Sequence, residues 1–170
     1  TLGLSNTSIN TLNISSNTAL ESLTMRNTGI TSLNLNTHTA LTYLNIGDNS
    51  IPSLDVTTNT ALVELYVDNA GLTSLNVKNG NNTNMTNFDA RTNVGLSCIT
   101  VDDAGYSTTN WTNRDATTGY SETTSCATTT ISDANFEAFL EANGMGNNIA
   151  NDNLVFTGNI FGVTSLDISG

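Results

Sequence analysis

Leucine-type residues return every 21 positions through the first half of the chain. This repeat constrains the fold more than any other feature of the sequence, because three apolar series keep the same phase. The series are Leu2, Leu23, Leu44 and Leu65; Ile9, Ile30, Ile51 and Leu72; and Leu12, Leu33, Leu54 and Leu75. The period is typical of a leucine-rich-repeat solenoid, in which each coil buries its apolar side only against its neighbours. Such a chain is expected to present an extended surface instead of a closed catalytic pocket.

Each repeat contains two short segments in which apolar and polar residues alternate. The first has the pattern Leu-x-x-Leu-x-apolar and recurs at 20–25, 41–46 and 62–67, and the second carries an apolar pair such as Leu54 and Val56. Alternation of this kind predicts half-buried strands, so each repeat should have two extended sides and no helix. After an insertion around Gly80, the pattern resumes with Phe88 and closes at Ile99. We therefore expect a mainly β solenoid over residues 1–99.

The repeat unit at 41–61 reads LTYLNIGDNSIPSLDVTTNTA. It resembles the 21-residue repeat of internalin J-type bacterial surface proteins and of large secreted repeat proteins of Bacteroidota. The resemblance covers residues 1–99 and implies a bacterial protein at the cell surface or outside the cell, secreted by the type IX route, with attachment as its general role. The internalin J type commonly has Cys at the sixth repeat position. Here the cysteine ladder is missing, because that position holds Leu4, Met25, Ile46 and Val67.

Residues 100–130 lose the period and are interpreted as a C-terminal cap. They resemble the cap that follows such repeats in Bacteroidota surface proteins. The aromatic residues Tyr106, Trp111 and Tyr120 are expected to cover the open end of the core, since aromatic side chains bury a large area each. A sugar-stacking role for Trp111 is the alternative.

Both cysteines of the chain, Cys98 and Cys126, bracket the segment where the repeat stops. We interpret them as a disulfide that fastens the end of the solenoid. Closing the intervening loop would contribute roughly 3 to 4 kcal/mol in the chain-entropy model. Two unrelated buried thiols are the alternative.

Residues 131–170 are predicted to start a new structural block. Ser132 can cap a helix over roughly 133–143 that has an apolar stripe containing Phe136 and Phe139 and stops at Gly144. The segment resembles the N-terminal cap that precedes a fresh repeat block, and residues 163–168 align in phase with residues 9–14. We therefore expect tandem continuation, either within a much larger polypeptide or by end-to-end stacking of copies. A truncated chain is the alternative.

The charge balance excludes two classes of partner. Four basic residues stand against fifteen acidic ones, and the net charge of −11 argues against binding nucleic acid or anionic lipid. No apolar run approaches the roughly 20 residues that a membrane helix needs, so we expect no membrane insertion.

Catalytic and cofactor motifs are missing from the sequence. The chain has one histidine, His38, which is in phase with Asn17 and Asn59 and should therefore hydrogen-bond the backbone of a neighbouring coil. We predict no enzyme activity and no cofactor. Weak candidates for a structural cation are Asp102, Asp103 and Asp115, because hard cations take carboxylate oxygens from irregular loops.

The outward positions of the first strands form the candidate binding surface. Tyr43 and Tyr66 lie on neighbouring coils, and the same face carries Glu64, Asp68, Asp89 and Arg91. Exposed tyrosines among charged groups can form a contact patch for protein or glycan, although ordinary surface residues are an equal alternative. We expect an extracellular structural and adhesive module that contacts neighbouring copies. The second hypothesis is recognition of one protein or glycan by this face.

Overall fold

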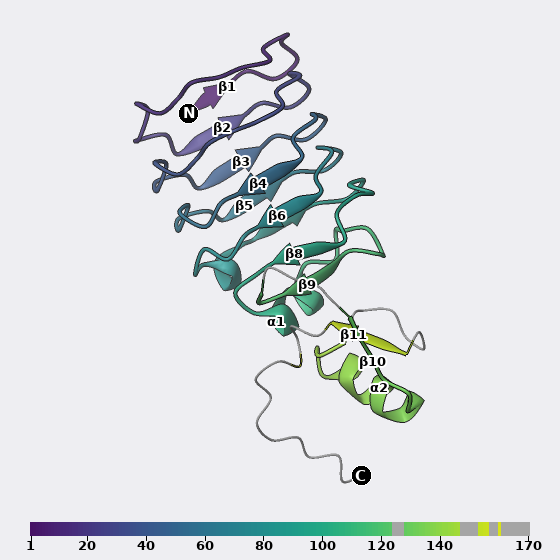
Figure 1. Ribbon diagram of the computed structural model, residues 1–170. Coiled ribbons are helices and arrows are strands. Elements are labelled where there is room, and N and C mark those ends of the chain that lie inside the picture. The colour runs from purple at the N-terminus through teal and green to yellow at the C-terminus, as the bar shows by residue number, and fades with distance from the viewer. Residues whose placement is uncertain (124–127, 147–152, 157–159, 161–170) are drawn as a thin grey trace.

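The computed structural model describes residues 1–123, 128–146, 153–156 and 160. The chain winds through stacked coils from the N-terminus to β9, and a smaller helical unit follows (Figure 1). One sheet has five strands in the order β1-β2-β3-β5-β7. These strands span Leu2–Gly3, Ser22–Thr24, Tyr43–Asn45, Glu64–Tyr66 and Asn87–Asp89. The second sheet has the order β4-β6-β8-β9, with bounds Ser53–Asp55, Ser74–Asn76, Cys98–Thr100 and Gly119–Ser121.

The five-stranded sheet is parallel and keeps one register throughout. Leu23 pairs with Leu44, Leu44 with Leu65, and Leu65 with Phe88. The three leucines are completely buried, while the residues on either side of each of them face outward. A shift of one residue would bring every leucine to the surface, so the apolar period fixes the register. The strands expected at 20–25, 41–46 and 62–67 are thereby confirmed.

The second extended side forms a sheet only from β4 onward. Residues 11–14 and 32–35 belong to no strand, although Ile14 and Leu35 are buried. The expectation of a strand on this side of every repeat is therefore wrong for the first two coils. The apolar pair still enters the core there, because burial of alternate side chains does not require ladder hydrogen bonds.

The insertion after β6 is absorbed by η1, a short 3-10 helix at Asn82–Asn84. The buried Asn82 side chain fixes this turn: its Nδ2 donates to the carbonyl of Val77 at 2.7 Å, and its Oδ1 accepts from the N–H of Asp102 at 2.8 Å. The extra residues are confined to this turn, so Phe88 keeps its register with Leu65.

A capping coil follows β8 and closes the core. It contains α1 (Ala104–Asn110) and β9, which pairs in parallel with β8 so that Ile99 lies opposite Tyr120. Trp111 stacks on Phe88 with ring centroids 4.4 Å apart. Trp111 and Tyr120 are buried, and Tyr106 packs against the same core. The predicted aromatic cap is confirmed. The sugar-stacking alternative for Trp111 is wrong, because only 3% of its surface is exposed.

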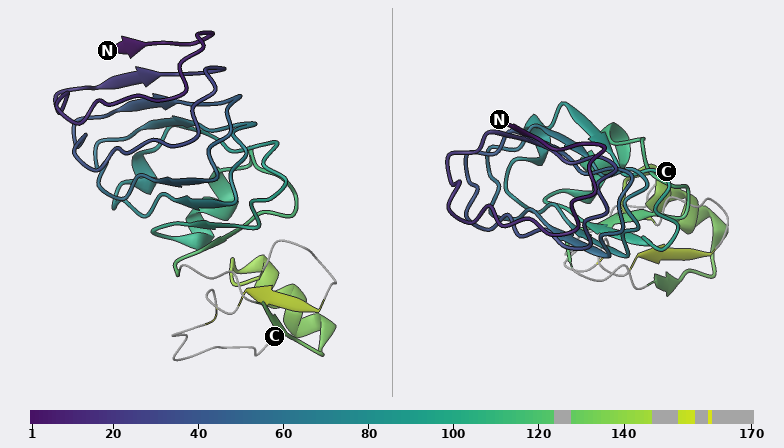
Figure 2. Two further views of the ribbon diagram at one scale, coloured as in Figure 1. Left: turned by 45° about the horizontal axis from the view of Figure 1, so that its top comes forward. Right: turned by 90° about the horizontal axis from the view of Figure 1, so that it is seen from above.

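The last described unit contains β10 (Thr128–Thr130), α2 (Ala134–Ala142) and β11 (Leu154–Phe156). The two strands pair antiparallel, and Figure 2 shows α2 beside them. The predicted helix is confirmed, but its cap is Asp133 and not Ser132. The Asp133 carboxylate accepts from the N–H groups of Asn135 and Phe136, each at 2.9 Å, and a carboxylate also favours the positive end of the helix dipole. Cys126 and residues 163–168 lie outside the described residues.

Candidate functional site

The outward face of the five-stranded sheet carries its side chains in three rows. The register places Ser22, Tyr43, Glu64 and Asn87 in the first row, and Thr24, Asn45, Tyr66 and Asp89 in the second. Backbone hydrogen bonds continue beyond the strands, from Asn27 to Gly47, Asp48 to Asp68 and Asn69 to Arg91. They align a third row of Arg26, Gly47, Asp68 and Arg91. The sequence-predicted binding residues therefore share one face.

Tyr43 and Tyr66 form the aromatic centre of this face. They are diagonal neighbours, because the register partner of Tyr43 is Glu64 and that of Tyr66 is Asn45. Their ring centroids lie 5.7 Å apart with an angle of 43° between the ring planes. Both side chains are half-buried, so each ring has one part packed on the sheet and another open to solvent. This spacing is typical of interacting aromatic pairs.

Glu64 links Tyr66 to the next coil and lies opposite Tyr43 in the strand register. Its Oε2 accepts from the Tyr66 hydroxyl at 3.1 Å and from Nδ2 of Asn87 at 3.2 Å. Burial and the hydrogen bond to Glu64 raise the pKa of Tyr66, so the phenol stays protonated at neutral pH. Within the described ranges, Glu64 forms no salt bridge. We call Tyr43, Asn45, Glu64, Tyr66 and Asn87 the tyrosine patch.

The third row is held by an ion-pair network that the sequence analysis missed. Arg26 donates from Nη1 and Nη2 to the two carboxylate oxygens of Asp68, at 2.9 and 2.6 Å, and its Nε lies 2.8 Å from Asp48. The hydrogen bond with Arg26 is the main cause that lowers the pKa of Asp68, and the same pair raises the pKa of Arg26. The signal for this contact was Gly47, which lies between Arg26 and Asp68 in the row.

Asp89 and Arg91 form a second ion pair beside the tyrosine patch. Nη2 and Nε of Arg91 donate to the two carboxylate oxygens of Asp89 at 2.6 and 3.0 Å. Asp89 is buried while Arg91 is exposed. The carboxylate of Asp89 is therefore already occupied by a guanidinium of its own coil.

The three aspartates considered for a cation bind backbone instead. Asp102 accepts from the N–H groups of Gly80 and Asn82, Asp103 caps α1, and Asp115 accepts from the N–H groups of Thr92 and Asn93. No group of three His, Cys, Asp or Glu side chains is placed to hold a metal ion in the part of the chain that the structure describes. The structure thus does not bring Asp102, Asp103 and Asp115 together as ligands.

His38 lies in the predicted ladder. Its imidazole is buried, and Nε2 donates to the carbonyl of Ile14 in the preceding coil at 3.1 Å. Asn59 repeats the contact one coil later, with Nδ2 donating to the carbonyls of Leu35 and His38. The role of His38 is therefore to satisfy backbone groups between coils, and its ring is not available for catalysis.

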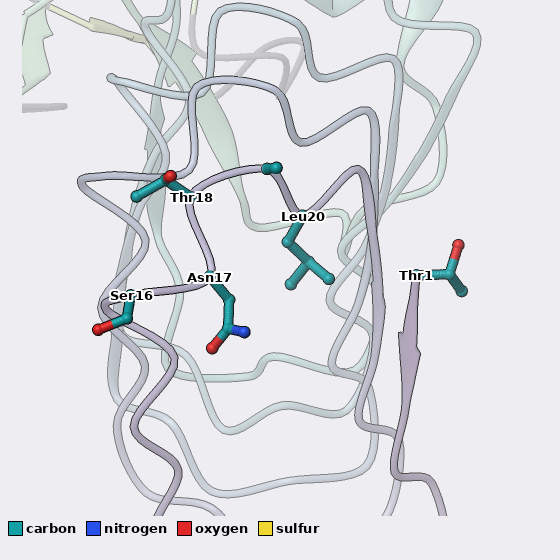
Figure 3. A pocket seen from close by; sticks show the side chains of 6 residues that line it. Thr1, Ser16, Asn17, Thr18 and Leu20 are labelled. Atoms are coloured by element: carbon teal, nitrogen blue, oxygen red, sulfur yellow. The ribbon is translucent and has the colours of Figure 1, made fainter.

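A hollow of about 380 Å³ lies at the first coil. It is lined by Thr1 and by Ser16, Asn17, Thr18, Ala19 and Leu20. Figure 3 shows the Asn17 and Leu20 side chains between Ser16 and Thr1. The hydroxyls of Thr1, Ser16 and Thr18 line this hollow, and none of the six lining residues is a His, Asp, Glu, Lys or Cys that could activate a hydroxyl as a general base.

Comparison with known proteins gives one structural likeness. No protein-family model matches the chain, and no curated protein matches it. The solved structure of the functional domain of InlJ from Listeria monocytogenes, described as including a cysteine ladder, is similar at 30% sequence identity with a TM-score of 0.46. The match covers 54% of this chain and 22% of that one, so the chain spans about a fifth of its length. Among the described residues, no helix is long and apolar enough to cross a membrane.

Proposed function

We propose that this chain is an adhesive repeat module of an extracellular bacterial surface protein, and that it attaches through the tyrosine patch without catalysing a reaction. The observation that carries the proposal is that Tyr43 and Tyr66 lie against each other and beside Glu64 on the face of a regular parallel sheet. Aromatic side chains that are partly exposed on a rigid surface bind at little cost in conformational entropy. The ion pairs of Arg26 and Arg91 hold the neighbouring row in place.

The solenoid supports a structural role beside the binding one. Its coils stack by parallel strand pairing and by side-chain ladders, which gives an extended scaffold on which copies can be spaced. We propose that such modules follow one another in tandem or end to end in a larger surface assembly of the Bacteroidota type. The Cys98–Cys126 disulfide is part of this proposal, because an oxidised cross-link would hold the end of the capping coil in an extracellular protein.

Adhesion of coated beads tests the proposed attachment surface. Beads carrying the wild-type chain, the Tyr43→Ser/Tyr66→Ser variant or a Ser53→Ala/Ser74→Ala variant of the opposite sheet are exposed to a panel of immobilised extracellular proteins and polysaccharides. We expect the wild type and the opposite-sheet variant to adhere equally to at least one surface, and the tyrosine variant to detach. Equal adhesion of all three, or adhesion of none, would contradict the proposal.

A further inference from the structure

The four basic side chains of the molecule all have partners inside it. Arg26 pairs with Asp48 and Asp68, and Arg91 pairs with Asp89. Nζ of Lys78 donates to the carbonyl of Glu122 at 2.7 Å. Arg114 donates to the carbonyl of Thr118 at 2.6 Å and lies over the ring of Tyr120, 5.3 Å from its centroid. The three arginines are thus held by carboxylates or by the ring of Tyr120, whereas the exposed Lys78 meets only a neutral carbonyl and keeps its charge. Two copies that each carry a net charge of −11 repel one another, which opposes pairing of copies through Lys78.

Glu64 is a carboxylate without a basic partner among the ion pairs of the described residues. It accepts hydrogen bonds from two neutral groups, the Tyr66 hydroxyl and the Asn87 amide, and neither neutralises its charge. The rings of Tyr43 and Tyr66 lie beside it, and the negative face of an aromatic ring attracts ammonium and guanidinium groups. A carboxylate next to two tyrosine rings thus combines an ion pair with two cation–π contacts.

The charges around the tyrosine patch are mainly negative, so they also favour a cationic ligand. The three rows contain the carboxylates of Glu64, Asp68 and Asp89, and Asp48 adjoins the third row, against the guanidinium groups of Arg26 and Arg91. The whole chain carries a net charge of −11, which attracts a cationic partner and repels an acidic one.

We propose that the tyrosine patch binds a lysine or arginine side chain of a partner protein, and that this partner is not another copy of the chain. The inference rests on the proposed attachment function and specifies the chemistry of the ligand. The cationic group would lie over the tyrosine rings and pair with Glu64. A neutral glycan would stack on the tyrosine rings but would gain little from the charge of Glu64. The effect of removing that charge therefore distinguishes the two kinds of ligand.

Titration with defined peptides, followed by NMR of the folded chain, tests the inference. The probes are capped decapeptides in which Gly alternates with Lys, Arg, Gln or Glu. We expect the Lys and Arg peptides to shift the resonances of Tyr43, Glu64 and Tyr66, and the Gln and Glu peptides to leave them unchanged. Equal binding of the Lys and Gln peptides would overturn the proposal.

Four variants separate the contributions at the patch. Glu64→Gln should weaken binding of the Lys peptide, whereas Asp55→Asn, which removes one exposed carboxylate from β4 on the other sheet, should not. Tyr43→Phe/Tyr66→Phe keeps the aromatic faces and should retain binding. Tyr43→Leu/Tyr66→Leu keeps apolar area alone and should weaken it by about two- to fivefold per ring. Equal weakening by Glu64→Gln and Asp55→Asn would show attraction to net charge only and would overturn the site.

The same variants distinguish failure of this inference from failure of the attachment function. If beads adhere to a polysaccharide in a manner that needs the tyrosines but not Glu64, and the Lys peptide does not bind, attachment stands and the cationic ligand is refuted. If neither peptide binding nor adhesion depends on the tyrosines, both proposals fail. Thermal unfolding of each variant checks that the solenoid remains intact in these measurements.

Discussion

The guanidinium of Arg26 binds the carboxylate of Asp68 across Gly47, so one side chain spans three consecutive coils. The two contacts measure 2.9 and 2.6 Å, and the residues are 42 positions apart. Strands in a sheet lie about 4.8 Å apart, so the pair bridges roughly twice that spacing. A partly exposed pair alone contributes little, but this one is bidentate and includes Asp48 as a third member, which are the conditions under which surface pairs contribute measurably.

Gly47 is the position on which this bridge depends. A Cβ there would overlap with Nη1 of Arg26 and lie 2.9 Å from both the carbonyl oxygen and Oδ1 of Asp68. We expect Gly47→Ala to lower the free energy of unfolding by roughly 1 to 2 kcal/mol, measured by chemical denaturation. Gly3→Ala is the matched control, because nothing lies within 4 Å of its Cβ. Equal stability of the two variants would contradict the bridge.

Arg26→Gln should change how stability depends on pH. Arg26 holds the pKa of Asp68 below its usual value, so the ionised carboxylate stabilises the folded state above about pH 4, and this stabilisation is lost as the pH falls through the folded-state pKa. We expect a stability difference of about 0.5 to 1 kcal/mol between wild type and variant near neutral pH, vanishing in acid. Denaturation midpoints across this range measure it.

The control for this pH effect is Lys78→Gln, which removes the same charge. Nζ of Lys78 donates to a backbone carbonyl, which does not titrate. The stability difference for Lys78→Gln should therefore not follow the protonation of Asp68. The carboxyl carbon resonance of Asp68 should also titrate at higher pH in Arg26→Gln than in the wild type, and an unchanged resonance would refute the assignment.

Most of the solenoid could be predicted from the sequence, because the 21-residue spacing of the apolar residues also sets the register in which the strands pair. Leu23, Leu44 and Leu65 can all be buried only if their strands pair in register. The capping coil was harder to recognise as a further repeat from the sequence, although Ile99 and Tyr120 are also 21 positions apart and pair in the structure. Here an aromatic residue replaces leucine and α1 interrupts the alternation. A pattern based on leucine therefore stops at Ile99 although the sheet continues.

The candidate site could be predicted as a face but not as a set of contacts. Alternation along each strand places Tyr43, Tyr66 and Glu64 outward, which the structure confirms. The contacts depend on the side-chain rotamers: the Tyr66 hydroxyl donates to Glu64 in its own strand, and Arg26 extends past one coil to Asp68 in the next. Long side chains have several allowed conformations, and residue spacing alone does not choose among them.

Thr92 occupies a turn position that disfavours it. The corresponding residues of earlier coils are Asn6, Asn27, Asp48 and Asn69, and all five have a left-handed backbone with φ between 50° and 61°. Asn and Asp tolerate this conformation, whereas a β-branched residue is strained there. We expect Thr92→Asn to raise the free energy of unfolding by about 1 kcal/mol. Thr11→Asn, at an exposed position with negative φ, should change it by less than about 0.5 kcal/mol. A destabilised Thr92→Asn would contradict the strain.

Asn93 provides the strongest test of the side-chain ladder. Its Oδ1 accepts from the N–H groups of Ala70 and Leu72, and its Nδ2 donates to the carbonyls of Val67, Ala90 and Arg91. Asn49 makes the same kind of bonds two coils earlier, where Oδ1 accepts from Thr28 and Gly29. The intervening coil has Ala70 in this phase, so it depends on Asn93 for its turn.

Asn93→Ala should therefore remove hydrogen bonds that no neighbouring side chain can replace. The amide is buried, and its removal leaves backbone donors and acceptors without partners where water does not reach. We expect a loss of about 3 kcal/mol in the free energy of unfolding.

Asn93→Asp should also destabilise the fold, because it keeps the acceptor but replaces the donor with a buried charge. Asn13→Ala, at an exposed Asn whose side chain accepts from the N–H and hydroxyl of Ser15, is the control and should cost less than about 0.5 kcal/mol. Hydrogen exchange at Ala70 and Leu72 should accelerate in Asn93→Ala and not in Asn13→Ala. Unchanged protection of these two amides would mean that the turn holds without the ladder.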